Sequence, residues 1–412
     1  MVLSPTSLFY VIITIILVVF LVDTFLDYLN AKQYSNPIPK ELDDIYEKDE
    51  HQKSINYKRA NYQFKTVSSI VSLILLLIFL YFNGFAYLDH HLRTISNNPI
   101  VLGLLFIGSL LIVSDLLALP FDYYRTFVIE ERFGFNTTTK KTFFMDKLKG
   151  LLLLIFVGGG LLSLIIWFYQ LTKENFWIYA WLLISFFTIL MNMFYAKLFV
   201  PLFNDQTPLE AGTLRDELQK YATNVGFKLK DIYVIDGSKR STKANAYFSG
   251  LGSEKRITLY DTLIKDLDTE EVVAVLAHEV GHYKKGHIVI NLALSILLTC
   301  FTFWLLAYFI DNPVLAQAFG VSNPSFHIGL IAFGILFSPI SEITGLLMNI
   351  VSRKFEYQAD NFAKKTYARN FLISSLKKLS KNNLSNLTPH PATVFVHYSH
   401  PTLLQRIKNL RE

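Results

Sequence analysis

Long apolar segments separated by shorter polar ones are the main pattern of this chain of 412 residues. Seven segments approach or exceed the length that a helix needs to cross a bilayer, about 20 residues. They are residues 6–22, 66–83, 100–120, 150–171, 176–199, 288–310 and 327–350. The first has no basic residue before it and no small-residue cleavage site after it, so we interpret it as a membrane span and not as a signal peptide.

The polar segment between the fifth and sixth spans has the pattern of a small α/β unit. Apolar residues recur at helical spacing over 214–225, which predicts an amphipathic helix. Three short strand-like runs separated by turn residues follow, at 231–236, 245–250 and 255–261.

A second helix of this unit is expected to begin near Asp268, because Asp268 and Glu271 have the spacing of a capping pair. Its pattern runs on into the sixth span. The helical pattern at 352–366 in turn continues the seventh span. Spans six and seven therefore form a predicted hairpin with one polar helix at each end, both on the same side of the membrane.

These patterns predict a mainly α, polytopic membrane protein with a small α/β domain outside the bilayer. We divide the chain into four parts. They are 1–200 with spans one to five, 201–287 with the α/β unit, 288–350 with spans six and seven, and 351–412 as the carboxyl-terminal part.

Composition supports a membrane protein, since 52% of residues are hydrophobic and only 17% are charged. The single cysteine, Cys300, lies in a predicted span. Neither a disulfide framework nor a thiolate cluster is therefore available, and any metal ligands must be nitrogen or oxygen atoms.

The distribution of the net charge of +6 predicts the orientation. Residues 23–65 contain seven Lys and Arg and residues 121–149 contain six, whereas the alternate loops 84–99, 172–175 and 311–326 contain at most one. Because basic loops stay on the cytosolic side, the amino terminus is expected outside and both large polar segments in the cytosol.

The stretch "HEVGH" at 278–282 carries the main candidate chemistry. On a helix, His278 and His282 lie one turn apart on the same face, where two imidazoles bind one zinc ion. Glu279 would lie beside the open metal position and take a proton from the attacking water. The alternative is a solvated helix with histidines placed by chance.

A catalytic zinc ion needs a third protein ligand. The best candidate is Glu356, which follows the return leg of the predicted hairpin, and we interpret His287 as a residue at a helix end. Asp360, four residues after Glu356, can fix the orientation of a ligand histidine, and Arg353 is assigned to the same supporting group. The alternative is a solvated helix face on which Glu356 and Asp360 pair with Arg353 and Lys364.

Several separated motifs together resemble those of the integral-membrane zinc metalloproteases of the CAAX prenyl protease type 1 family. They are "FVIEERFGFNTTT", "GSKRSTKANAYFSG", "KRITLYDTL", "HEVGHYKKGH", "RKFEYQAD" and "HYSHPTLLQRI". The resemblance implies seven spans that enclose a water-filled chamber, one Zn²⁺ per chain at its cytosolic end, and cleavage near the prenylated carboxyl terminus of CAAX proteins.

The resemblance also assigns roles residue by residue. His278, His282 and Glu356 would bind zinc, with Glu279 as the general base. His400 would donate to the developing oxyanion. Residues that would contact or support the substrate are Asn245, Ala246, Tyr247, Phe248 and Arg406. From the residues alone, Tyr247 and Phe248 are equally compatible with a core position, and Arg406 with a surface ion pair.

Polar residues at predicted membrane depth fit a chamber, because ionisable groups that face lipid are costly. They are Asp115, Asn192, Asn291 and Glu342. Hydrogen bonds between helices are the alternative, and for the two asparagines we favour it.

The predicted partners are the lipid bilayer and a peptide or protein substrate that is prenylated at its carboxyl terminus, and no nucleic acid. The host membrane would be the endoplasmic reticulum or nuclear envelope in a eukaryote and the inner membrane in a bacterium. Other readings are a quality-control protease with broad substrates, a transporter with a regulatory metal site, and an inert zinc scaffold. Glu279 separates these classes, because only hydrolysis requires it.

Overall fold

The protein is described by a computed structural model over residues 4–227, 229, 231–249 and 256–412. Six helical runs in this part of the chain are long and apolar enough to cross a membrane. One run, Lys140–Phe203, covers the two predicted spans at 150–171 and 176–199. The long helices are α1 (Pro5–Lys32), α2 (Lys48–Tyr81), α4 (Pro99–Tyr124), α6 (Lys140–Leu153), α7 (Gly159–Thr172), α8 (Phe176–Leu198), α12 (His287–Phe309) and α14 (Phe326–Thr366).

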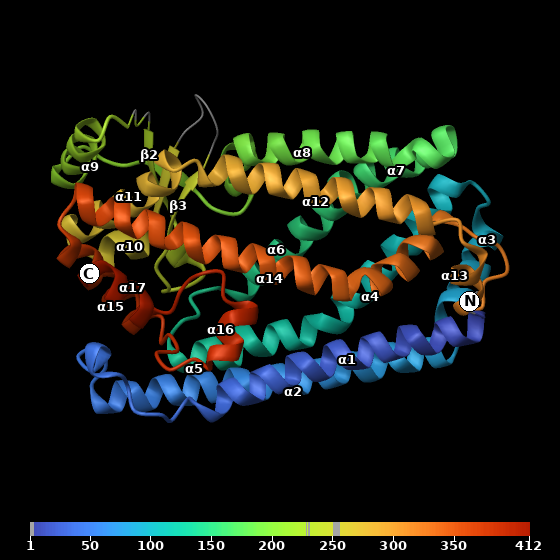
Figure 1. Cartoon of the computed structure of the whole chain (residues 1–412), viewed down its shortest axis with the longest axis horizontal. Helices are drawn as coiled ribbons and strands as arrows, with labels where there is room; N and C mark the ends of the chain where they lie inside the picture. Colours follow the sequence, from blue (N-terminus) through green and yellow to red (C-terminus); the bar gives the residue numbers. More distant parts are fainter. Residues whose placement is uncertain (1–3, 228, 230, 250–255) are drawn as a thin grey trace.

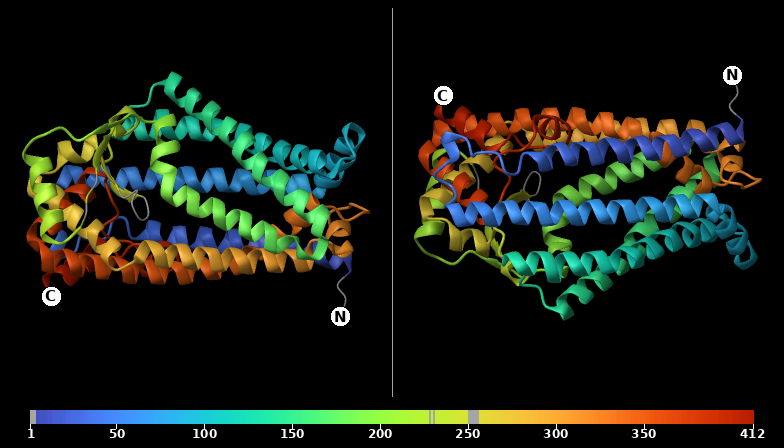
Figure 2. Two further views of the ribbon diagram at one scale, coloured as in Figure 1. Left: turned by 90° about the horizontal axis from the view of Figure 1, so that it is seen from above. Right: turned by 90° about the horizontal axis from the view of Figure 1, so that it is seen from below.

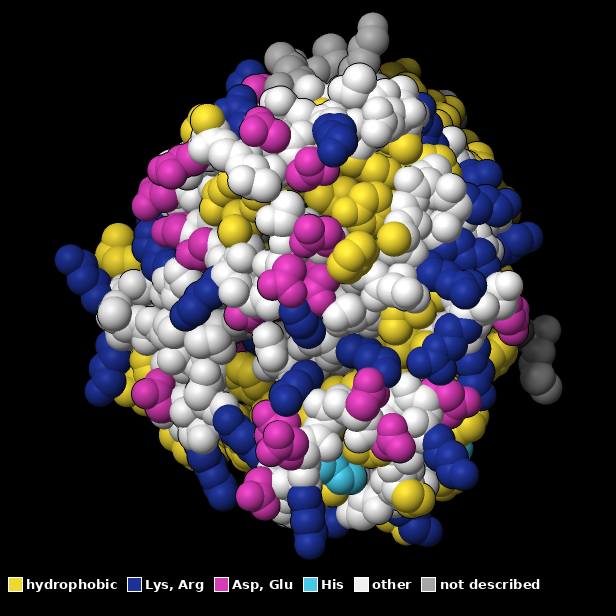
Figure 3. Space-filling view, turned by 90° about the vertical axis from the view of Figure 1, so that its left-hand side faces the viewer, with side chains coloured by type: hydrophobic (Ala, Val, Ile, Leu, Met, Phe, Trp, Pro, Cys, Tyr) yellow, Lys and Arg dark blue, Asp and Glu magenta, His cyan; other side chains and the backbone are white. Residues whose placement is uncertain are grey.

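The long helices extend along one axis of the molecule, and the mixed α/β part gathers at one end (Figures 1 and 2). The two chain termini lie at opposite ends (Figure 1). Lys, Arg, Asp and Glu side chains are spread over the end that carries the α/β part (Figure 3). The molecule is therefore an elongated helical body with a charged cap.

The cap contains four strands, one more than predicted: β1 (Gln206–Pro208), β2 (Asp231–Ile235), β3 (Ala246–Ser249) and β4 (Arg256–Tyr260). The sheet order is β1-β2-β4-β3, with β2 and β4 parallel and the outer pairs antiparallel. The sequence did not reveal β1, because it has three residues and ends in proline. The predicted strand ends at Gly250 and Lys255 lie outside the described residues.

Shorter helices complete the cap and the opposite end. In the cap they are α5 (Glu131–Phe133), α9 (Thr213–Asn224), α10 (Asp261–Asp266), α11 (Thr269–Lys284), α15 (Arg369–Asn382), α16 (Pro391–His397) and α17 (Leu403–Arg411). At the opposite end are α3 (Gly84–Ile95), in a segment expected to be a loop, and α13 (Pro313–Ala318). The predicted helix at 214–225 is confirmed as α9.

The prediction that the helix beginning near Asp268 runs into the sixth span is wrong. Its amino-terminal capping box of Asp268 and Glu271 is confirmed, but α11 ends at Lys284. Gly286 has a left-handed conformation (φ 72°), which glycine adopts without steric cost, and α12 begins at His287. The polar helix and the span are therefore two separate helices.

Apolar packing is concentrated at the two ends of the helical body. Phe106, Ile166 and Ile328 are core residues of the end away from the cap, and Leu218 and Leu276 are core residues of the cap. Between these ends, residues 334–354 of α14 and 288–305 of α12 contain no buried residue. The middle of the helical body is thus loosely packed.

Candidate active site

Helix α11 places the "HEVGH" stretch inside the cap. Its apolar side, which includes Val273, Leu276 and Val280, belongs to the core of the cap. His278 is also buried and His282 is half-buried. The helix packs on the polar end of α14, where Gly281 allows the backbone of Ala359 to approach closely. Two helices far apart in sequence thereby bring their polar residues together.

Three donor atoms from these two helices converge. His278 Nε2 and His282 Nε2 are 3.1 Å apart. Glu356 Oε1 lies 3.1 Å from His282 Nε2, and Glu356 Oε2 lies 3.4 Å from His278 Nε2. Ligand atoms about 2.0 Å from a tetrahedral zinc ion are about 3.3 Å apart, so the observed separations fit a shared ion.

The environment of Glu356 also fits a metal ion. Its carboxylate is buried at the interface of α11 and α14, yet Oε2 has no hydrogen-bond partner among the described residues. A buried carboxylate oxygen without a partner is costly unless a cation or another donor satisfies it. Two imidazoles and one carboxylate form a ligand set of catalytic zinc sites.

A carboxylate and a guanidinium contact the side of the His278 ring that faces away from the three converging donor atoms. Its Nδ1 lies 2.8 Å from Asp360 Oδ1, and Arg406 binds both Asp360 oxygens at 2.9 and 2.6 Å. Burial and the charge of Arg406 lower the pKa of His278, but the neighbouring carboxylates of Asp360 and Glu356 outweigh them and raise it to about 9. A metal ion bound at Nε2 has to replace that proton.

A third histidine holds His282, and the sequence analysis missed this role. His287, the first residue of α12, shares a hydrogen bond of 3.0 Å with His282 through the Nδ1 atoms. Its Nε2 lies 2.8 Å from Gln358 Oε1, and its ring stacks on Phe355 at 4.1 Å. The turn at Gly286 brings His287 next to His282. The presence of a third histidine shortly after the motif is the sequence feature from which this contact could have been predicted.

The two residues predicted to carry proton chemistry lie next to this centre. Glu279 is half-buried and forms no hydrogen bond or ion pair with the described residues. His400 is 64% exposed, and its Nε2 lies 3.3 Å from Glu356 Oε1. His400 Nδ1 lies 2.9 Å from the hydroxyl of Ser399. Both side chains are thus available to a substrate.

The segment predicted to bind the substrate backbone is the edge strand β3. Asn245 precedes it, and its carbonyl accepts a hydrogen bond from Tyr260 on β4. Tyr247 packs with Tyr260 against the end of α8, and its hydroxyl has no partner among the described residues. Ala246 packs against the core of the cap, and Phe248 is paired with Ile257 in the sheet.

Two predicted site residues have different surroundings from those expected. Arg353 binds the carbonyl groups of Val394 and Tyr398, so it positions the segment before His400 and contacts no zinc-ligand candidate. The side chain of Arg406 is 12% exposed and paired with Asp360, so it supports a ligand histidine, and its predicted contact with the substrate stays a prediction. Glu356 and Asp360 are buried, which excludes the alternative of a solvated helix face.

The polar residues at membrane depth differ in their partners. Asp115 pairs with Lys147 at 2.9 Å in a run, 111–117, in which every residue is exposed. Glu342 is also exposed. Asn192 donates to the carbonyl of Thr188 on its own helix, and Asn291 Oδ1 is buried without a partner among the described residues. The hydrogen bond of Asn192 is therefore within one helix, not between two.

Taken together, the fold and the site define a membrane metallopeptidase: an HExxH helix faces a carboxylate from a second helix that continues into an apolar span. Comparisons with known proteins agree. Residues 27–205 match the family model of the CAAX prenyl protease N-terminal region, with five membrane helices, and residues 208–412 match peptidase family M48. The chain belongs to the CAAX prenyl protease family of zinc metallopeptidases.

Individual relatives are similar over nearly their whole length. The chain is 36% identical to CAAX prenyl protease 1 homolog of Dictyostelium discoideum, with 94% of this chain and 92% of the relative covered. It is 35% identical to CAAX prenyl protease 1 of Saccharomyces cerevisiae, with the same coverage. The crystal structure of S. mikatae Ste24p matches with a TM-score of 0.92 at 34% identity, covering 98% of this chain and 99% of that one.

Proposed function

We propose that this metallopeptidase hydrolyses peptide bonds near the carboxyl terminus of prenylated CAAX proteins, with one zinc ion held by His278, His282 and Glu356. The observation that carries the zinc assignment is the convergence of three donor atoms around a buried carboxylate oxygen, Glu356 Oε2, that has no hydrogen-bond partner among the described residues. The names of the relatives support the substrate class.

Zinc bound at this site supplies Lewis-acid polarisation and lowers the pKa of water towards neutrality. Glu279 takes the proton of the attacking water on its carboxylate and returns it to the leaving amine. His400 donates from Nε2 to the substrate carbonyl oxygen, where negative charge develops. Asp360, Arg406 and His287 keep the two ligand histidines in position.

The peptide is held in extended form beside β3. An edge strand has unpaired backbone groups that can pair with a substrate backbone. Asn245 and the backbone of Ala246, Tyr247 and Phe248 would form these contacts. Because the ring of Tyr247 packs against α8, we propose that Tyr247 contacts the substrate through its backbone and not through its ring.

For the membrane part we propose seven spans, with the run Lys140–Phe203 crossing twice, and an active site that faces the cytosol. The alternation of basic and neutral loops and the charged cap support this orientation. The division at residues 200, 287 and 350 is part of the proposal, and the boundary between the two family matches, 205–208, supports the first cut. In a eukaryote the host membrane would be the endoplasmic reticulum or nuclear envelope.

We further propose that the spans enclose a chamber. Residues 111–117 of α4 are all exposed. Seven consecutive residues make almost two turns of a helix. Every side of α4 is therefore exposed over this stretch, including the side that faces the other helices, as expected if α4 lines a chamber. The unburied middle sections of α12 and α14 support the same interpretation.

The test is a paired assay of purified wild type and Glu279→Gln. We expect one zinc per chain in both proteins, cleavage of a farnesylated CAAX peptide by wild type only, and no cleavage of the peptide without farnesyl. Equal cleavage of both peptides would refute the prenyl assignment and favour a protease with broad substrates. Cleavage by the variant would refute the role of Glu279.

A further inference from the structure

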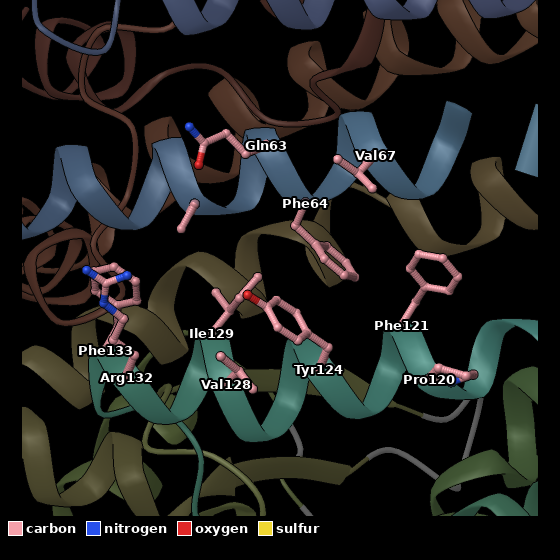
Figure 4. Close-up of a pocket in the computed structure, with 11 residues that line it drawn as sticks. Gln63, Phe64, Val67, Pro120, Phe121, Tyr124, Val128, Ile129, Arg132 and Phe133 are labelled. Atoms are coloured by element: carbon pink, nitrogen blue, oxygen red, sulfur yellow. The ribbon is translucent and has the colours of Figure 1, made fainter. Parts of the chain in front are cut away.

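A cavity of about 480 Å³ lies between α2 and the carboxyl-terminal end of α4, apart from the zinc site. Its volume is in the usual range of ligand sites, about 300–1,000 Å³. Side chains from the two helices face each other across it (Figure 4). The lining residues are Ala60, Gln63, Phe64, Val67, Pro120, Phe121, Tyr124, Val128, Ile129, Arg132 and Phe133.

Two backbone irregularities form one wall of the cavity. Pro120 lies inside α4, where it removes a helical hydrogen bond, and residues Arg125–Glu130 form a π-helix (η2). Val128 and Ile129 of η2 line the cavity. A proline inside a helix costs about 3 kcal/mol, and π-helical turns occur frequently at functional sites. The wall therefore combines two local irregularities of the helix with two residues, Ile129 and Phe133, that belong to a buried core.

The wall is apolar along the membrane-spanning part of both helices. The ring of Phe64 stacks on Tyr124, with centroids 5.9 Å apart, and lies 6.3 Å from Phe121. The acidic residues of α4, Asp115 and Asp122, both pair with Lys147 of α6 and do not line this cavity. The cavity thus presents hydrocarbon and aromatic surface within the candidate spans.

A single charged side chain lines the cavity, at the end towards the cap. Arg132 is exposed and forms no hydrogen bond or ion pair with the described residues. The two preceding carboxylates have other partners: Glu130 binds Lys243 and Tyr57, and Glu131 binds Asn136. The guanidinium of Arg132 rests over the ring of Phe133 at 5.5 Å and is free to bind an anion.

We propose that this cavity binds one phospholipid, with an acyl chain between α2 and α4 and its phosphate on Arg132. An apolar cleft within the spans with one cation at the cytosolic end matches the amphipathic shape of a lipid of that leaflet. Guanidinium groups bind phosphate oxygens by charge-assisted hydrogen bonds. A prenyl thioether carries no charge itself, and the carboxylate of a CAAX peptide lies three residues beyond the prenylated cysteine, so the phosphate of a phospholipid matches the single cation beside the apolar cleft more directly.

The bound lipid has a route to the proposed substrate strand. Glu130, the last residue of η2, receives hydrogen bonds from Tyr57 at 2.6 Å and from Lys243 at 2.9 Å. Lys243 lies two residues before Asn245 and also donates to the Tyr57 hydroxyl at 2.8 Å. A lipid that stabilises η2 therefore stabilises the start of β3. This part rests on the proposed function.

The test is native mass spectrometry of the full-length detergent-solubilised protein, titrated with phosphatidylglycerol or with diacylglycerol, which lacks the phosphate. We expect wild type to bind one phosphatidylglycerol selectively. Arg132→Gln should weaken that binding about tenfold, the loss of one charge-assisted hydrogen bond, and leave diacylglycerol binding unchanged. Val67→Trp, which fills the cavity, should weaken the binding of both lipids.

Matched controls are Ile78→Trp, exposed on the same helix outside the cavity, and Arg369→Gln, an exposed arginine in the cap. Both should bind lipid as wild type does. Unchanged lipid binding in Val67→Trp would overturn the proposal, as would displacement of the lipid by farnesyl-cysteine methyl ester, which would assign the cavity to the prenyl chain. Mass spectrometry counts the lipids bound per chain and requires no peptidase activity. The lipid-binding proposal is therefore tested separately from the proposed function.

The coupling is tested by activity. Added phosphatidylglycerol should raise the kcat/KM of wild type for a peptide substrate, and Arg132→Gln should lose this response. An equal response of both proteins would refute the coupling through η2. The lipid-binding site itself would still be decided by mass spectrometry.

Discussion

At the scale of single residues, the site depends on giving the two nitrogens of each ligand histidine different partners. His278 and His282 direct Nε2 to the common centre, while their Nδ1 atoms contact Asp360 and His287. Such partners fix the ring orientation and the tautomer. The residues behind the ligands are therefore as specific to this chemistry as the ligands themselves.

We expect Asp360→Asn to reduce both metal affinity and stability. The guanidinium of Arg406 would keep only its longer contact with Glu356, at 3.6 Å, as a counter-charge, and breaking a buried ion pair typically costs up to about 3–5 kcal/mol. Loss of the carboxylate behind His278 should lower zinc affinity about 10–100-fold. Zinc competition with a chelator and thermal unfolding measure the two effects.

The control for this prediction is Glu217→Gln, which breaks an exposed pair with Lys220 on α9. Exposed pairs contribute at most about 1 kcal/mol, so both measurements should stay near wild type. If Asp360→Asn matched this control, the support of His278 by Asp360 would be disproved.

At the scale of elements, the site depends on how closely α11 and α14 pack. A Cβ atom on Gly281 would lie 3.0 Å from the Cα and the carbonyl oxygen of Ala359. These are backbone atoms, which cannot rotate away. The glycine inside the motif is therefore required by the distance between the helices that carry the two histidines and Glu356.

Gly281→Ala should force α11 away from α14 by a few tenths of an ångström. Overpacking of this kind costs about 1–3 kcal/mol, although alanine favours a helix over glycine by about 1 kcal/mol. We expect lower zinc affinity and a lower melting temperature. Gly160→Ala in α7 is the control, because nothing lies within 4 Å of its added Cβ. Equal behaviour of the two variants would contradict the close-packing argument.

At the scale of the whole molecule, packing holds the helical body mainly at its ends. At the end away from the cap, His327 of α14 lies 2.7 Å from Asp89 of α3, and Arg93 binds the same carboxylate at 2.8 Å. Asp89 and His327 are both buried. This cluster ties α3 to the start of the longest helix.

The cluster predicts a loss of stability in acid. Burial raises the pKa of Asp89, but hydrogen bonds from His327 and Arg93 outweigh burial and hold the pKa below its ordinary value. The stabilisation is therefore present above the unfolded pKa, about 3.9, and is lost as the pH falls through the folded value. The melting temperature should therefore decrease as the pH is lowered below about 4.

Asp89→Asn should lower stability at neutral pH and make its decline below pH 4 smaller than in wild type. Thermal unfolding at a series of pH values measures both effects. Asp216→Asn is the control, because Asp216 is exposed on α9 and forms no ion pair with the described residues. An identical acid profile for Asp89→Asn and wild type would disprove the role of this cluster.

Much of the fold and the site could be predicted from local sequence. The apolar segments predicted a mainly helical membrane protein, and the helical spacing in "HEVGH" placed His278 and His282 on one face. The choice of Glu356 depended on the hairpin topology, which follows from span lengths. The strand β1 and helix α3 were missed, because short elements lack a clear period.

The sequence alone determined the membrane class, the zinc motif and the cap of α11. These features follow from the hydrophobic period and the ligand spacing, which depend only on neighbouring residues. Only the tertiary structure decided that Arg406 lies behind Asp360, that Arg353 holds the segment before His400, and that the turn at Gly286 brings His287 to His282. These contacts join side chains distant in sequence or placed by one backbone turn. Their partners are set by how α11, α14 and α17 pack, which no local pattern specifies.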